Sequence, residues 1–139
     1  MTEKLTTILL IEDDEVDIMT VQRAFGKNKI TNPFYVARNG VEALQMLRGE
    51  NQAKIIPQVI LLDINMPKMG GLEFLENLRA DEQLKSISVF VLTTSAQESD
   101  KMSAFNLNVA GYILKPLSFD SFLEAVAVLK NYWKLCERL

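Results

Sequence analysis

Short apolar runs alternate with longer amphipathic stretches along almost the whole chain. The apolar runs are rich in valine, isoleucine and leucine, and their length is that of buried strands. The amphipathic stretches repeat their apolar residues at steps of three and four, which predicts helices with one buried face. The predicted strands cover residues 7–11, 34–38, 58–63, 87–92 and 110–114.

A helix is predicted after each strand. The first is expected to end at Gly26, and the second to follow an Asn-Gly turn and to place Val41 on its buried face. Ser118 is a suitable cap for the last helix. The predicted helices cover residues 14–26, 41–48, 72–80, 97–106 and about 118–137, and the pattern is weakest in 97–106.

The alternation of strands and helices indicates an α/β domain with a parallel sheet covered on both faces. The chain shows no repeat and no change of composition that would divide it. Right-handed crossovers restrict such a sheet to a few doubly wound orders. Ligands bind these sheets beyond the carboxyl ends of the strands, so residues at those ends are the candidates for function.

Three acidic residues lie at two of these strand ends. Glu12 and Asp13 follow the strand at 7–11, and Asp63 ends the strand at 58–63. If the two strands are neighbours, three carboxylates meet, and their repulsion requires a cation or a shared proton. Carboxylate oxygens without thiol or imidazole ligands select Mg²⁺ or a similar divalent ion. The sequence therefore predicts a metal site.

The acids that follow directly, Asp14, Glu15 and Asp17, have a simpler explanation. Asp14 is expected to cap the next helix, and acids in a first helical turn complement the helix dipole. The same explanation fails for Asp63, because the helix after it begins several residues later. The acidic run is thus predicted to be a metal site followed by a helix start.

Two further strand ends carry polar residues at the same edge. The strand at 87–92 is followed by a run of three hydroxyl residues, Thr93, Thr94 and Ser95, and the strand at 110–114 by Lys115. A hydroxyl and an ammonium group directed at a metal-bound carboxylate suit a tetrahedral oxyanion such as a phosphoryl group. A single such lysine is more often a surface residue, so the argument depends on the whole set.

The composition excludes several other chemistries. The 139 residues include no histidine and one cysteine, which excludes a Ser-His-Asp triad, a typical zinc site and an internal disulfide framework. The glycines form neither a dinucleotide-binding motif nor a P-loop. A net charge of −3 lacks the excess of positive charge that is typical of nucleic-acid-binding proteins, and no apolar run is long enough to span a membrane. The start is not a signal peptide, and a cytoplasmic location is expected.

Four segments together resemble the receiver domains of two-component response regulators. They are ILLIEDD at 8–14, VILLDINMPKMGG at 59–71, VLTT at 91–94 and GYILKP at 111–116. Each is moderately specific, and the four in order are highly so. The resemblance implies a flavodoxin-like (βα)5 fold, doubly wound, with its five parallel strands in the order 2-1-3-4-5. We expect residues 1–139 to form one receiver domain without an output domain.

The resemblance implies a role for each candidate at the metal site. Asp63 would accept the phosphoryl group. Asp13 would bind Mg²⁺ directly, Glu12 would do so largely through water, and Asn65 would offer its backbone carbonyl. Glu12 stands where aspartate is more usual in the family, and this variant should keep the metal site.

The resemblance also implies how the signal leaves the site. Thr93 would contact the phosphoryl group and Lys115 would pair with it. Tyr112 would change its rotamer with phosphorylation, which alters the surface of the fourth helix, fifth strand and fifth helix. Without the resemblance, Tyr112 would be interpreted as an ordinary half-buried strand aromatic.

The partners follow from the same resemblance. Because the chain has no histidine, the donor is expected to be a phosphohistidine on a sensor histidine kinase or a phosphotransfer protein. The extended aromatic last helix resembles that of small regulators paired with phytochrome-type kinases. We expect a signalling protein with a downstream protein target, which promotes its own phosphotransfer and slow autodephosphorylation but is otherwise not an enzyme.

Two apolar stripes run along the last predicted helix, whereas a helix packed on a sheet needs only one. The second stripe favours a homodimer through the fourth helix, fifth strand and fifth helix, or a docking surface. A broad core face with a frayed tail is the alternative. The candidate interface residues are Tyr112, Phe122, Val128, Tyr132, Trp133 and Leu135.

Two other functions fit parts of the pattern. A phosphatase of the haloacid-dehalogenase class also carries a phosphorylated aspartate at a strand end, but it expects an acid two residues later, where Asn65 stands. A receiver-like interaction module that is not phosphorylated would be expected to lack the acceptor, the lysine or the acid pair. None of the three is missing, so the phosphorylated receiver is preferred.

Overall fold

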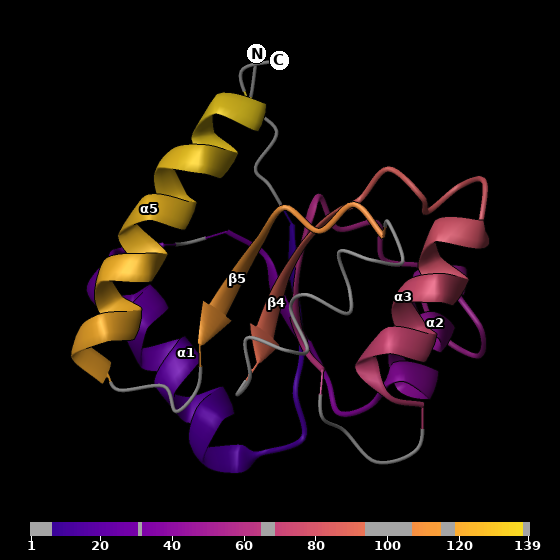
Figure 1. Ribbon diagram of the computed structural model, residues 1–139, viewed down its shortest axis with the longest axis horizontal. Helices are drawn as coiled ribbons and strands as arrows, with labels where there is room; N and C mark the ends of the chain where they lie inside the picture. Colours follow the sequence, from indigo (N-terminus) through magenta and orange to yellow (C-terminus); the bar gives the residue numbers. More distant parts are fainter. Residues whose placement is uncertain (1–6, 31, 65–68, 94–106, 115–118, 138–139) are drawn as a thin grey trace.

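The chain forms one five-stranded parallel sheet in the order β2-β1-β3-β4-β5, which confirms the predicted topology (Figure 1). The computed structural model describes residues 7–30, 32–64, 69–93, 107–114 and 119–137, and in the last range it excludes the side chains of 121 and 132–137. The strands are β1 (Ile8–Ile11), β2 (Phe34–Ala37), β3 (Val59–Asp63), β4 (Ser88–Thr93) and β5 (Gly111–Leu114).

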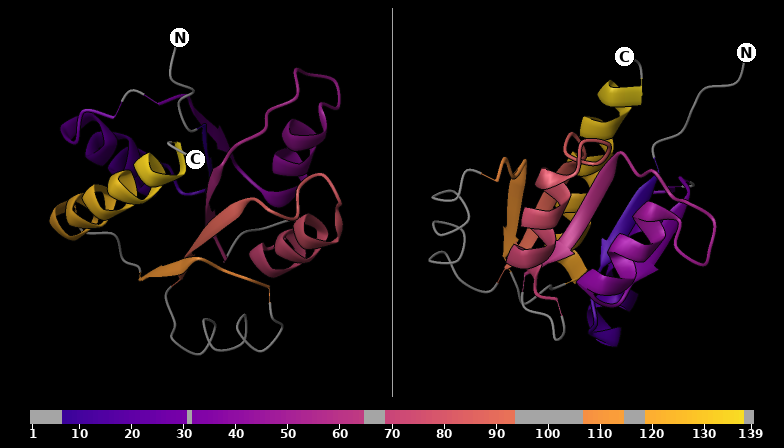
Figure 2. Two further views of the ribbon diagram at one scale, coloured as in Figure 1. Left: turned by 90° about the horizontal axis from the view of Figure 1, so that it is seen from above. Right: turned by 90° about the vertical axis from the view of Figure 1, so that its right-hand side faces the viewer.

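Helices cover both faces of the sheet (Figures 1 and 2). One face packs against α1 (Glu15–Lys27) and α5 (Phe119–Glu137), and the other against α2 (Gly40–Arg48) and α3 (Gly71–Ala80). The helix predicted over 97–106 and Ser118, the predicted cap of the last helix, lie outside the described residues. Among the described helices, none combines the length and apolar character of a membrane span.

Two apolar cores, one on each face, hold the layers together. Strands β1 and β3 are buried along their whole length, as expected for central strands of a covered parallel sheet. Each fully buried aliphatic side chain contributes about 1.5–3 kcal/mol. The largest fully buried side chains are Phe74, Phe122, Ile8, Leu9, Leu10, Ile11, Leu47, Ile60, Leu61, Leu62 and Leu75.

Helix α5 is fastened to α1 by polar contacts as well as by the core. The side-chain amide of Asn28 donates to the carbonyl of Leu123 at 3.2 Å, and the Lys130 ammonium donates to the carbonyl of Asn28 at 2.8 Å. The Arg23 guanidinium lies 4.8 Å from the ring centroid of Phe119, within cation–π range. These contacts hold the part of α5 from Phe119 to Lys130 against α1.

Two local predictions were wrong. Helix α1 does not end at Gly26 but runs to Lys27, and Asn28 is its C-cap. The Asn28 side chain donates to the Ala24 carbonyl at 3.1 Å, so an amide ends this helix where a glycine was expected. Val41 is 41% exposed, because the buried face of α2 is formed by other residues: Gly40, Ala43, Leu44, Met46 and Leu47.

Gly26 is therefore an exposed helical glycine with no structural requirement, since a Cβ there would meet nothing within 4 Å. Gly26→Ala is expected to stabilise the protein by about 0.5–1 kcal/mol, because alanine loses less backbone entropy on folding. Urea unfolding measures this. A lower midpoint would contradict it. Gly49→Ala provides the contrast: Gly49 has φ of 72°, so alanine there is expected to destabilise by about 1 kcal/mol.

Candidate metal and phosphoryl site

The acidic cluster forms at the carboxyl ends of the two central strands. The register of β1 and β3 pairs Ile11 with Leu62, so the next residues along each strand, Glu12 and Asp63, come side by side. One carboxylate oxygen each from Glu12, Asp13 and Asp63 lie within 4.8 Å of one another. Strands one and three are thus neighbours, and the three acids meet as the sequence predicts.

Burial makes this cluster electrostatically costly. Glu12 is 0% exposed and Asp63 2% exposed, whereas Asp13 is exposed to solvent. Carboxylates held so close in a poorly solvated place repel one another unless a cation or a proton compensates them. Oxygen ligands of this kind, with one side open to solvent, fit a hard divalent cation that keeps several of its waters. The residues present therefore fit a Mg²⁺-type ion.

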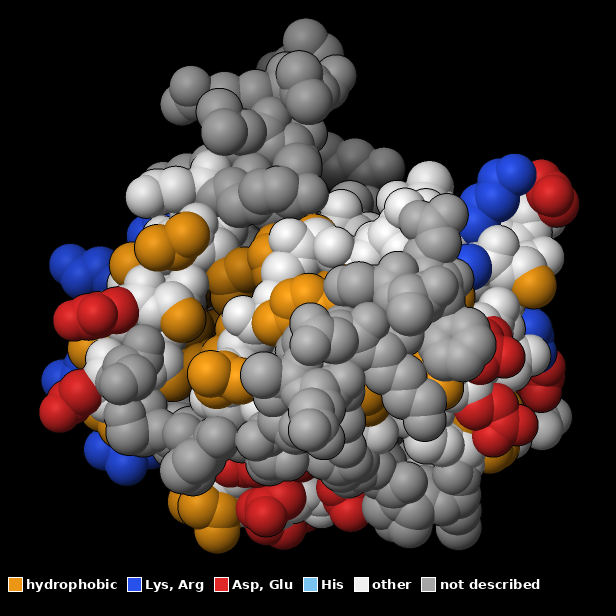
Figure 3. All heavy atoms as spheres, in the orientation of Figure 1, with side chains coloured by type: hydrophobic (Ala, Val, Ile, Leu, Met, Phe, Trp, Pro, Cys, Tyr) orange, Lys and Arg blue, Asp and Glu red, His pale blue; other side chains and the backbone are white. Residues whose placement is uncertain are grey.

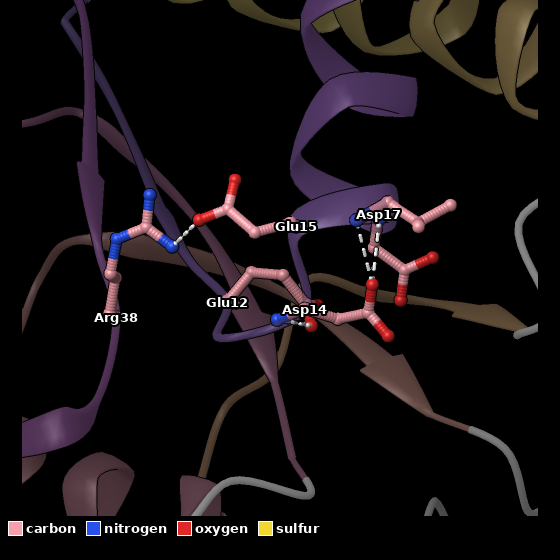
Figure 4. A network of polar contacts seen from close by, with 6 residues as sticks. Glu12, Asp14, Glu15, Asp17 and Arg38 are labelled. Carbon is pink, nitrogen blue, oxygen red and sulfur yellow. Dashed lines mark hydrogen bonds and ion pairs between the residues drawn. The ribbon is translucent and has the colours of Figure 1, made fainter.

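The remaining acids of the run have separate partners, as Figure 4 shows. Asp14 is the N-cap of α1, and its Oδ1 accepts from the backbone N–H groups of Val16 at 2.8 Å and Asp17 at 3.2 Å. The backbone N–H of Asp14 in turn donates to Oε1 of Glu12 at 3.2 Å. The predicted helix start at Asp14 is confirmed, and it is distinct from the cluster of Glu12, Asp13 and Asp63, whose metal binding stays a prediction.

Glu15 is directed away from the cluster by an ion pair that sequence reasoning missed. Its carboxylate binds the guanidinium of Arg38, the residue after β2 (Figure 4). The two side chains are 65% and 50% exposed, so the pair contributes little to stability. Its geometric effect is to tie the start of α1 to the connection between β2 and α2. Nothing in the sequence spacing of Glu15 and Arg38 indicates this contact.

Thr93 lies at the same end of the sheet, where the parallel strands finish. Figure 3 shows acidic side chains at the lower margin of the molecule, on this side. Thr93 is the last residue of β4, one residue beyond the predicted end, and its side chain is fully buried. The register pairs Asp63 with Leu92, the residue before Thr93. The structure therefore brings the predicted hydroxyl to the strand next to Asp63. Asn65 and Lys115 lie outside the described residues.

The candidate interface residues are only partly available at the surface. Tyr112, on the edge strand β5, is 37% exposed, and Val128, on α5, is 69% exposed. Phe122 is 1% exposed and packs in the core between α5 and the sheet, so its assignment to an interface was wrong. Phe122, Val126 and Leu129 face the sheet because α5 needs that face to close the core. The side chains of Tyr132, Trp133 and Leu135 are outside the described part.

These features first define a class of protein. The sheet reverses its strand order between β1 and β3, and doubly wound proteins bind their ligands at such a switch point. Here that point carries buried carboxylates and a neighbouring hydroxyl instead of a glycine-rich phosphate loop. The chain is a flavodoxin-like α/β protein with a cluster of three carboxylates at the switch point.

Comparison with known proteins identifies the family. The sequence profile described as response regulator receiver domain matches residues 8–127. The chain therefore belongs to the response regulator receiver family, whose members are signalling proteins phosphorylated on an aspartate. Such domains interact with histidine kinases or phosphotransfer proteins.

Its relatives include small response regulators from different signalling systems. The probable methanogenesis regulatory protein FilR2 of Methanothrix harundinacea is 38% identical over 91% of this chain and 82% of its own length. The response regulator Rcp1 of Synechocystis is 34% identical over 91% of this chain and 87% of its own length. The bacteriophytochrome response regulator RtBRR has a similar structure, with a TM-score of 0.79, 40% identity, and coverage of 89% and 77%.

Proposed function

We propose that Asp63 is the residue that accepts the phosphoryl group. The observation that carries this proposal is the grouping of Asp63 with Glu12 and Asp13 within 4.8 Å, at the end of a central strand. Asp63 cannot serve as a helix cap, since α3 begins only at Gly71. An acid so buried and so close to two others has a function that depends on compensating charge.

Glu12, Asp13 and Asp63 would hold a divalent cation, and Mg²⁺ is the ion we propose. A crystal structure of the relative Rcp1 is of its Mn²⁺-bound form, which supports a divalent cation here as well. The backbone carbonyl of Asn65 would be a further ligand. When bound, the ion offsets the charge of the carboxylates and of the phosphoryl oxygens during transfer.

The side chains of this site then act mainly by position. An oxygen of Asp63 forms a bond to phosphorus while the bond between phosphorus and the histidine nitrogen of the partner breaks. The imidazole leaves as the neutral ring when its other nitrogen carries a proton, and otherwise takes up a proton from water. The Thr93 hydroxyl donates to a phosphoryl oxygen, and the Lys115 ammonium pairs with another. Water reverses the modification slowly, as autodephosphorylation.

The output of the domain would be a change of surface. In this proposal Thr93 moves toward the phosphoryl group and Tyr112 turns inward, which alters the face formed by residues 94–106, β5 and α5. Residues 1–139 would act as one receiver unit in the cytoplasm. A histidine kinase of the phytochrome type would phosphorylate it, and the phosphorylated form would then bind a protein target. A homodimer would use the same face, including Val128, Tyr132, Trp133 and Leu135.

Phosphoryl uptake tests this function directly. With Mg²⁺ and acetyl phosphate, the wild type is expected to gain the mass of one phosphoryl group, and Asp63→Asn is expected to gain none. Asp17→Asn is the matched control, because it removes a neighbouring acid outside the cluster and should leave uptake intact. If the wild type shows no Mg²⁺-dependent gain, the chain is an interaction module and the proposal is wrong.

A further inference from the structure

The connection between β3 and α3, which follows Asp63 directly, is held by backbone hydrogen bonds at both ends. The N–H of Ile64 donates to the carbonyl of Leu92 at 3.1 Å, and the carbonyl of Ile64 accepts from the N–H of Gly71 at 3.1 Å. Near the other end, the carbonyl of Met69 accepts from the N–H of Gly40 at 3.3 Å. The connection is thus anchored to β4, to α3 and to the start of α2.

Two of these anchors are glycines, and both are in close contact with the connection. A Cβ on Gly71 would lie 2.5 Å from the Cα of Ile64 and 3.0 Å from the carbonyl oxygen of Asp63. A Cβ on Gly40 would lie 2.8 Å from the carbonyl oxygen of Met69 and 2.9 Å from its Cβ. Real Cβ contacts are essentially never so short, so a side chain at either position forces the connection to move.

Gly40 also lies on a segment that contacts the other half of the acidic cluster. Asn39, expected to form a turn, is instead the N-cap of α2, and its side-chain oxygen accepts from the N–H of Glu42 at 2.8 Å. The N–H of Gly40, in the first turn of the helix, donates to the carbonyl of Met69. Just before Asn39, Arg38 pairs with Glu15, and the carbonyl of Ala37 accepts from the N–H of Glu12 at 2.9 Å. The β2–α2 connection therefore contacts the segments of both Glu12 and Asp63.

We propose that Gly40 is a positioning residue of the phosphoryl site. By carrying no Cβ, it lets α2 approach Met69 closely, and the hydrogen bond from its N–H holds Met69 in place just before α3. The inference rests on the function proposed above and adds a residue far from Asp63 in the sequence. Functional groups must be held to within about 0.5 Å of their working geometry, and the Cβ at Gly40 displaces Met69 by a comparable distance.

Gly40→Ala is the test, with two readouts taken well below the unfolding temperature. The Mg²⁺ dissociation constant, measured by calorimetry, is expected to rise about tenfold, as is typical when the support of a metal ligand is disturbed. The rate of phosphorylation by acetyl phosphate at saturating Mg²⁺ is expected to fall by a similar factor.

Gly49→Ala is the matched control, because Gly49 lies at the opposite end of the same helix. Alanine there is strained by the φ of 72° and approaches Lys54 instead of Met69. It is expected to lower the unfolding temperature while leaving both the Mg²⁺ affinity and the phosphorylation rate unchanged. If Gly40→Ala also changes only the unfolding temperature, the positioning role is wrong.

A second measurement, in the Met69→Gly variant, distinguishes the proposed contact from a general folding defect of Gly40→Ala. Met69→Gly removes Cβ and Cγ of Met69, two of the three atoms nearest to the new Cβ, and leaves the carbonyl oxygen at 2.8 Å. The penalty of Gly40→Ala on Mg²⁺ affinity is expected to be smaller in this background but still present, because the shortest contact remains. A larger penalty in this background overturns the inference. A wild type that neither binds Mg²⁺ nor takes up phosphate overturns the proposed function instead.

Discussion

In the absence of Mg²⁺, Asp63→Asn is expected to raise the melting temperature of the protein. Glu12 and Asp63 are both almost fully buried, and Asp13 has a carboxylate oxygen within 4.8 Å of theirs. Replacing one of three mutually repelling carboxylates by a neutral amide of the same shape relieves that repulsion. We expect a gain of about 1–2 kcal/mol in unfolding free energy, or roughly 3–8 °C for a domain of this size.

The same substitution is expected to remove most of the stabilisation by Mg²⁺. An ion present at one hundred times its dissociation constant stabilises the native state by about 2.7 kcal/mol. Asp63→Asn is expected to lose this stabilisation because the substitution removes one of the carboxylates that hold the ion. Thermal unfolding in EDTA and in Mg²⁺ measures both effects. Asp17→Asn should retain the Mg²⁺ shift of the wild type. A lower melting temperature of Asp63→Asn in EDTA would show that the cluster is not repulsive.

Arg79→Met is expected to destabilise the protein by about 2–4 kcal/mol. The Arg79 guanidinium, at the end of α3, donates to four backbone carbonyls that precede strands β4 and β5. The hydrogen bonds join it to Lys85 at 2.7 Å, Ile87 at 2.7 Å, Leu107 at 2.8 Å and Asn108 at 3.0 Å. Methionine keeps the aliphatic part of the side chain but leaves these acceptors without their donor.

The chemistry of the guanidinium is what makes Arg79 difficult to replace. Burial lowers the pKa of Arg79, yet an arginine remains charged and its planar fork reaches several acceptors at once. Arg79→Lys, with a single ammonium centre, is expected to recover only part of the stability. Arg48→Met is the control, because its ion pair with Asp81, at 3.6 Å, is partly exposed and should matter little. Urea unfolding of the three variants decides: a change below 0.5 kcal/mol in Arg79→Met would contradict the expectation.

The parts of this protein that the sequence predicted well are those that depend on local pattern. The alternation of buried strands and amphipathic helices is a property of neighbouring residues, and it predicted the five strands of one parallel sheet that the structure contains. The acids Glu12 and Asp63 were predicted to meet on the condition that their strands are neighbours, and the structure fulfils it. Residue type and strand direction placed both acids at the same end of the sheet, and the resemblance to receiver domains supplied the strand order.

The parts that failed depend on contacts between distant segments. Gly26 was taken as a helix stop, but the amide of Asn28 ends α1 and also reaches α5. Phe122 was assigned to an interface because helical spacing alone does not say which of two apolar stripes faces the sheet. Gly40 was taken as part of a turn, since nothing near it in the sequence indicates Met69 as a neighbour. The alternation of side chains along a strand is local, whereas the rotation of a helix on a sheet depends on distant segments.

The central position of β1 and β3 has a consequence for how the domain opens. Each of these strands is paired on both sides and buried throughout, while β2 and β5 are paired on one side only. Amide hydrogens of central strands exchange with solvent only when most of a domain opens, whereas edges fray at lower free energy. Amides of Leu10 and Leu61 should thus exchange most slowly, and those of Tyr35 and Ile113 earlier. The acids at the ends of β1 and β3 are therefore anchored to the last part of the domain to open.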